Sequence, residues 1–102
     1  MTYLPGGQNI CGVSIGVLSL ESYFPKPPGH IKNPSSLPFT TTYEILHGLT
    51  VPELLNNPSV DMLEPIIAAA QRLEAQGARA ITGSCGFLAM FQKEIAEAVS
   101  IP

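Results

Sequence analysis

The stretch ITGSCGFLAM, residues 81–90, decides the fold, because an apolar run gives way to small residues and a cysteine before a helix-like pattern begins. Residues 78–84 are predicted to form a strand with its exit at Cys85 and Gly86. The helix that follows carries Phe91, Ile95 and Val99 at helical spacing. A strand, a tight turn and a helix form the repeating unit of parallel α/β sheets.

Two more strands and two helical segments precede this unit. Strands are predicted over residues 12–20, GVSIGVLSL, and 39–48, FTTTYEILHG, because both are rich in β-branched and aromatic residues. A short helical turn is expected over 51–55, with Thr50 and Glu53 as its capping box. A longer helix ending before Gly77 has Asp61 and Glu64 as its start signature, and its apolar face comprises Leu63, Ile66, Ile67, Ala70 and Leu73.

The remaining segments are predicted to be loops. Residues 1–11 are irregular, and residues 21–38 form a long proline-rich loop of the kind that is usually functional. Ser100-Ile101-Pro102 resembles the lead into a further strand. The fold class is therefore α/β: a small, doubly wound, mainly parallel sheet of about three strands with flanking helices. Residues 1–102 are expected to form a single lobe that is truncated before a second, similar lobe.

Composition limits the environment and the partners of the chain. Its 102 residues are 45% hydrophobic with a mean hydropathy of +0.24, which suffices for one core. Only 13% are charged, so we expect part of the surface to be covered by a second lobe or another copy of the chain. The net charge of −3 argues against nucleic acid, and no apolar run suits a membrane span. Without a signal-peptide pattern, a cytoplasmic protein with reduced thiols is expected.

Cys85 is the residue that most needs a chemical explanation. It would lie at the carboxyl end of a strand, where open α/β sheets bind ligands, and just before a helix whose unpaired N–H groups favour a thiolate. Thr82, Ser84 and Gly86 would line the same pocket, which would suit a carboxylate substrate. A buried structural cysteine explains the residue equally well. A metal site is not expected, because no Cys or His lies at ligand spacing.

Five other residues are weaker candidates. His47 would end a strand on the same edge as Cys85, and His30 lies in the proline-rich loop; both could equally be inert surface histidines. Cys11 would lie at the opposite edge of the sheet, which favours a structural role. Glu44 and Glu21 could serve as acids, although solvated charges are the default.

Two motifs carry a resemblance to a known family. Residues 12–34, GVSIGVLSLESYFPKPPGHIKNP, are followed by residues 81–92, ITGSCGFLAMFQ. In that order they resemble the N-terminal lobe of the aspartate/glutamate racemase superfamily, near the hydantoin-racemase branch. The specific parts are the F-P-x-P-P-G-x-I-x-N-P loop and the T-x-S-C-G-F-L turn, and the resemblance covers residues 12–102.

The resemblance implies a racemase or epimerase that uses no cofactor such as pyridoxal phosphate. The Cys85 thiolate would remove the proton α to the carboxylate of an amino acid or a derivative. A thiol from a second lobe would protonate the opposite face. Matched to this sequence, the substrate-binding positions would be Thr82, Ser84, Gly86, Asn33 and Pro34.

Two departures from the family pattern shape the expectation. His30 stands where relatives carry an acid, and Lys32 replaces a common glycine. The chain also offers one thiol where racemisation needs an acid and a base on opposite faces of one carbon. We therefore expect the chain alone to be inactive. The alternatives are a non-catalytic fragment that binds a carboxylate or a partner chain, and a related carbanion enzyme such as a decarboxylase or a cis–trans isomerase.

Overall fold

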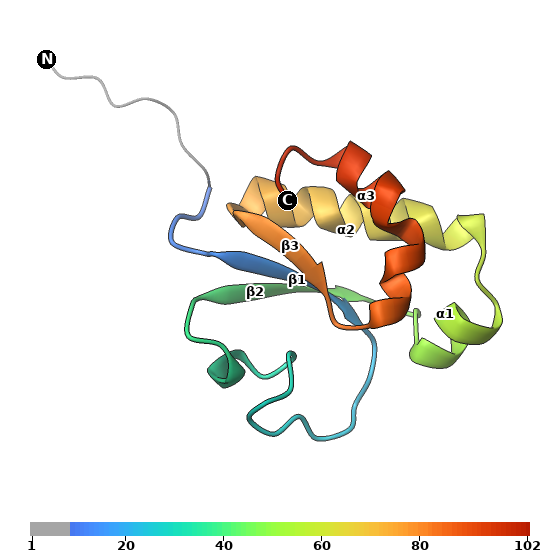
Figure 1. Cartoon of the computed structure of the whole chain (residues 1–102), viewed down its shortest axis with the longest axis horizontal. Helices are drawn as coiled ribbons and strands as arrows, with labels where there is room; N and C mark the ends of the chain where they lie inside the picture. Colours follow the sequence, from blue (N-terminus) through green and yellow to red (C-terminus); the bar gives the residue numbers. More distant parts are fainter. Residues whose placement is uncertain (1–8) are drawn as a thin grey trace, which may run out of the picture.

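The computed structural model describes residues 9–102 as three parallel strands with helices packed against them (Figure 1). Strand β1 spans Ile15–Leu20, β2 spans Thr41–Leu46 and β3 spans Ala80–Gly83, in the spatial order β2-β1-β3. Because both pairings are parallel, the carboxyl ends of all three strands lie at one edge. The predicted parallel α/β sheet is confirmed. Residues 1–8 of the segment predicted to be irregular lie outside the described residues.

Within residues 9–102 the structure also has three α-helices and three short 3₁₀ segments, and the last of each follows β3. The α-helices are α1 (Val51–Asn56), α2 (Leu63–Gln76) and α3 (Gln92–Ala98). The 3₁₀ segments are η1 (Pro34–Ser36), η2 (Val60–Met62) and η3 (Gly86–Phe91). None of the helices within residues 9–102 is long and apolar enough to cross a membrane.

Helix α2 forms the core by packing against all three strands and α3. Its fully buried side chains are Ile66, Ala69, Ala70 and Leu73. The predicted apolar face is largely confirmed, although Leu63 and Ile67 are only partly buried. The predicted end is also confirmed, because Gly77 adopts a left-handed φ of 113° that non-glycine residues rarely take.

Gly16 in β1 allows α2 to approach the sheet closely. A Cβ atom at this position would lie 3.0 Å from Leu73 Cδ2 and 3.1 Å from Ala78 Cβ. Polar contacts fix the other side of α2 to β2, since Glu44 accepts hydrogen bonds from Arg72 Nε at 3.2 Å and Gln76 Nε2 at 2.9 Å. The helix is therefore anchored over β1 and β2, and its position sets that of the strand ends.

The segment between β1 and β2 is the predicted proline-rich loop, with η1 inside it. In the view of Figure 1 this loop lies below the strands, on the side away from α2 and α3. Tyr43 Oη, on β2, donates a hydrogen bond to the Ile31 carbonyl at 2.7 Å. Within the loop, Ser36 Oγ accepts from the Gly29 N–H and donates to the His30 carbonyl, each at 2.7 Å. The loop is thus cross-linked to the sheet and to itself.

Two predicted helix starts differ from the structure. Asp61 does not cap α2; Ser59 instead caps η2 by accepting from the Asp61 N–H at 3.1 Å, and α2 continues from η2 without a side-chain cap. After Cys85 the chain forms the 3₁₀ segment η3 before α3 begins at Gln92. By contrast, Thr50 caps α1 as predicted, accepting from the Glu53 N–H at 3.3 Å.

Candidate functional site

The carboxyl ends of the three strands bring the segments that follow them to one edge. Glu21 follows β1, His47 follows β2 and Ser84 follows β3. Ligands of open α/β sheets bind at this edge, so it is the first place to search for a site.

Ser84 attaches the end of β3 to β1. Its N–H donates to the Leu18 carbonyl at 2.9 Å, and its Oγ accepts from the Leu20 N–H at 3.0 Å. The two hydrogen bonds fix the backbone immediately before Cys85. Ser84 was predicted to bind substrate, and in the structure its hydroxyl has this positioning role.

Cys85 is half-buried and occupies the N-cap position of η3, where its side chain makes no capping hydrogen bond. One side of it packs on the hydrophobic core. Cys85 also lines a pocket of about 310 Å³ between β3 and the η3–α3 segment. The thiol is therefore not sealed inside the core, as a purely structural cysteine would be.

The pocket combines a polar strand end with apolar helical walls. Thr82, Gly83 and Gly86 contribute from the strand side, and Leu88, Gln92 and Ile95 from η3 and α3. A Cβ atom at Gly86 would meet nothing within 4 Å, so the space beside it is open. The C-terminal residues close one side, where the Pro102 carbonyl accepts from the Ile81 N–H at 2.8 Å. The predicted strand lead at Ser100–Pro102 thus lies against β3.

The structure brings some of the predicted site residues together and separates others. Thr82, Cys85 and Gly86 line the pocket, as the sequence indicated. Asn33 and Pro34 do not line it. The Asn33 amide is engaged in the loop: its Oδ1 accepts from the Ser35 N–H at 3.0 Å, and its Nδ2 donates to the Lys26 carbonyl at 2.8 Å.

The two candidate histidines lie in different surroundings. His30 Nδ1 accepts from the Lys32 N–H at 3.0 Å, and its ring meets Phe24 edge-on with centroids 5.4 Å apart. His47 is 76% exposed and places Nδ1 3.4 Å from a Glu21 carboxylate oxygen. Among the described residues, no group of three or more His, Cys, Asp and Glu side chains could hold a metal ion.

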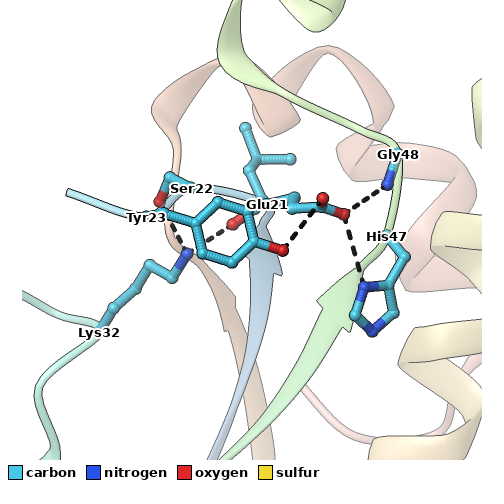
Figure 2. A network of polar contacts seen from close by, with 7 residues as sticks. Glu21, Ser22, Tyr23, Lys32, His47 and Gly48 are labelled. Carbon is cyan, nitrogen blue, oxygen red and sulfur yellow. Dashed lines mark hydrogen bonds and ion pairs between the residues drawn. The ribbon is translucent and has the colours of Figure 1, made fainter.

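Glu21 joins the ends of β1 and β2 (Figure 2). Its carboxylate accepts from the Gly48 N–H at 2.7 Å and from Tyr23 Oη at 3.1 Å, with His47 beside it. The Gly48 hydrogen bond, followed by that from Tyr23, holds the pKa of Glu21 below its ordinary value. Conversely, the hydrogen bond to Glu21 raises the pKa of Tyr23. A carboxylate is therefore held at this edge.

Lys32 is the functional candidate that the sequence did not identify. Figure 2 shows its ammonium group at the end of β1, where it donates to the Leu20 carbonyl and to Ser22 Oγ. Burial lowers the pKa of Lys32, and the nearby charge of Lys26 lowers it further. The available signal was the presence of two of the three lysines of the sequence, Lys26 and Lys32, in one loop.

Comparison with known proteins gives relatives of one kind. The chain is 35% identical to dimethylsulfoniopropionate lyase 6 of Emiliania huxleyi (strain CCMP1516) over 81 residues, which cover 78% of this chain and 21% of that protein. It is 32% identical to dimethylsulfoniopropionate lyase 5 of the same strain over 92 residues, which cover 87% of this chain and 18% of that protein. A dimethylsulfoniopropionate lyase of Durusdinium sp. clade D is 29% identical to this chain over 97 residues, which cover 84% of this chain and 29% of that protein. These curated relatives are lyases.

The matches cover most of this chain but little of each relative. The chain spans between 18% and 29% of the length of these three proteins. Because the match to lyase 5 covers 87% of this chain, it includes both the proline-rich loop and Cys85 wherever it begins. No family model matches the chain, and no solved structure matches it significantly.

The assignment to the aspartate/glutamate racemase superfamily was therefore wrong, and so were the racemase activity and the isomerase class inferred from it. The similar proteins are named for a lyase, a different family. The loop and the cysteine turn specify where a thiol lies in the fold. They do not specify which bond of a substrate breaks.

Proposed function

We propose that this chain carries part of a lyase site that cleaves dimethylsulfoniopropionate into dimethyl sulfide and acrylate. The observation that carries the proposal is the similarity to proteins named for this activity over 78–87% of the chain, at 32–35% identity. The pocket at Cys85 supports it, because a half-buried thiol at the carboxyl edge of a parallel sheet is a suitable base.

The substrate needs proton removal next to a carboxylate. It is a zwitterion with a carboxylate at one end and a dimethylsulfonium group on the β carbon. A base takes a proton from the α carbon, the electron pair of that C–H bond forms the α–β double bond, and the bond from the β carbon to sulfur breaks. Sulfur keeps that bond's electrons and leaves as neutral dimethyl sulfide. Acrylate remains, and the proton stays on the base.

Cys85 is our candidate for this base. In its thiolate form it can accept the α proton, and the apolar wall formed by Leu88 and Ile95 limits the water that could compete for it. Ser84 positions the turn through its two hydrogen bonds to β1. Thr82 and Gly86 leave polar groups and open space beside the thiol. This elimination needs one base, so it does not require the second thiol that racemisation would need.

A segment replacement tests the proposal. The 92 matched residues of Emiliania huxleyi lyase 5 would be replaced by the matching residues of this chain, and dimethyl sulfide would be measured by headspace gas chromatography. We expect the hybrid to release dimethyl sulfide and the same hybrid with Cys85→Ser to lose at least about 100-fold in rate. Cys11→Ser should have no such effect where Cys11 falls within the replaced segment. A folded hybrid that releases dimethyl sulfide equally well with Cys85→Ser would reject Cys85 as the base, and one that releases none would reject the function.

A further inference from the structure

Two lysines of the proline-rich loop converge on one residue at the end of β1. Lys26 Nζ donates to the Ser22 carbonyl at 2.7 Å, and Lys32 Nζ donates to Ser22 Oγ at 3.0 Å and to the Leu20 carbonyl. Each ammonium group therefore approaches a different polar atom of Ser22. The sequence holds three lysines in all, so two of them are concentrated at this point of an acidic chain of net charge −3.

No carboxylate compensates this pair within residues 9–102. The ion pairs of the described residues are His47 with Glu21 and Arg72 with Glu44, and neither involves a lysine. Glu21 lies nearby, but its oxygens are directed to Gly48, Tyr23 and His47 (Figure 2). Two like charges held together without a counter-charge repel each other, and an anion placed between them relieves that repulsion.

The loop holds the two lysines through their backbone groups and through one aromatic contact. The Asn33 side chain donates to the Lys26 carbonyl at 2.8 Å, and the Lys32 N–H donates to His30 Nδ1 at 3.0 Å. The Phe24 ring lies under the Lys26 ammonium group, 4.2 Å from ring centroid to Nζ. The arrangement is thus built into the backbone and side chains of the loop before any ligand arrives.

The geometry also leaves capacity for a ligand. An ammonium group has three N–H donors, and Lys32 directs two of them to Ser22 and Leu20. A carboxylate can accept charge-assisted hydrogen bonds from two cations at once. Glu21 lies on the same edge with the opposite charge, as recognition of a zwitterion requires.

We propose that Lys26 and Lys32 together bind the carboxylate of the substrate at the end of β1. Neither lysine lines the Cys85 pocket, but Leu20 connects the two places, because its carbonyl accepts from Lys32 Nζ and its N–H donates to Ser84 Oγ, next to Cys85. This inference rests on the proposed function, because that function supplies a substrate with a carboxylate. Glu21 and the exposed ring of Tyr23 would then lie toward the sulfonium group, since both attract a cation. The sequence analysis instead assigned carboxylate binding to Thr82, Ser84 and Gly86, and placed Asn33 and Pro34 in the substrate-side loop.

Titration of the 102-residue chain with propionate, followed by NMR of the backbone amides, tests the inference. Propionate has the carboxylate and lacks the sulfonium, and chloride would hold the ionic strength constant. We expect saturable shifts at residues 20–33, and a propionate Kd weakened about tenfold or more by Lys32→Met, the loss expected for one charge-assisted hydrogen bond. Lys26→Met should also weaken binding, and it leaves the Lys32 contacts to β1 in place. Lys93→Met, at an exposed position of α3, is the matched control and should leave the Kd unchanged.

The outcomes separate this inference from the proposed function. A propionate Kd that is unchanged in both Lys26→Met and Lys32→Met, or shifts confined to another part of the chain, would overturn the carboxylate site. Lysine-dependent propionate binding together with a folded hybrid that releases no dimethyl sulfide would keep the site and reject the lyase. Dimethyl sulfide release with an unchanged KM in a Lys32→Met hybrid would keep the lyase and reject the site.

Discussion

Gly16 shows how one residue sets the distance between the helix layer and the sheet. A methyl group there would meet Leu73 and Ala78 at 3.0–3.1 Å. We therefore expect Gly16→Ala to lower the free energy of unfolding by about 1–3 kcal/mol, as overpacking does. Urea unfolding of the variant and of the unmodified chain measures this difference in free energy.

Gly86→Ala is the matched control for Gly16, because a methyl group there meets nothing within 4 Å. It should change the free energy of unfolding by less than about 1 kcal/mol. Equal stability of the two alanine variants would contradict the close packing of α2 on β1.

The pKa of Lys32 reports directly on the charges at the end of β1. Burial is the larger of the two causes that lower the pKa of its ammonium group, and the positive charge of Lys26 lowers that pKa further. An NMR titration of the Lys32 Cε resonance should therefore have a midpoint below the ordinary 10.5. Lys26→Met should raise that midpoint only part of the way, because burial remains. Propionate should raise it as well, by stabilising the charged form. A midpoint unaffected by Lys26→Met would show that the two charges do not interact.

At the residue scale the sequence predicts position better than role. Cys85, Thr82 and Gly86 line the pocket as predicted, because a strand end followed by a turn leaves few places for these residues. Ser84 and Asn33 were expected to bind substrate, yet their polar atoms satisfy nearby backbone groups. A hydroxyl or amide in a sequence does not reveal which partner it will find. The convergence of Lys26 and Lys32 depends on the path of a long loop, which no local pattern specifies.

Among the elements, the segment from the end of β1 to η1 places charged side chains at the carboxyl edge of the sheet. It contributes Glu21 and both lysines, and it is held to β2 through Tyr43 and Gly48. The sequence predicted this long loop from its prolines, and its functional role stays a prediction. The strands and α2 were also predictable, because their hydrophobic periods are strong. The start of α2 and the 3₁₀ form of η3 were not, because short capping patterns compete with one another within a few residues.

The hydrogen bond from the Gly48 N–H to Glu21, which links the ends of β1 and β2, should contribute to stability in a pH-dependent way. The pKa of Glu21 is lower in the folded chain than its ordinary 4.5, chiefly because the Gly48 N–H stabilises the carboxylate. Such a group contributes stability above the unfolded pKa and loses it as the pH falls through the folded pKa. We expect Glu21→Gln to destabilise the chain near neutral pH, and the difference from the unmodified chain to shrink in acid below about pH 4. A difference in urea midpoint that is constant from neutral to acid would rule this out.

For the whole molecule, the architecture followed from alternating strand and helix patterns, and the reaction did not. A thiol at the carboxyl edge of a parallel sheet suits removal of a proton α to a carboxylate. The fate of the resulting carbanion depends on the leaving group of the substrate, which this sequence does not encode. This is why the same residues led to a racemase, whereas the relatives, of which this chain spans 18–29%, are named as lyases.

The central claim is that Cys85 faces the substrate, and alkylation in the presence of dimethylsulfoniopropionate tests it most directly. The chain would be treated with iodoacetamide, and modification of each cysteine followed by mass spectrometry. Cys11 is exposed and lies at the other end of β1, so it serves as an internal control. The account predicts that dimethylsulfoniopropionate slows the alkylation of Cys85 in a saturable manner and leaves that of Cys11 unchanged. Alkylation of Cys85 at the same rate with and without the substrate would contradict it.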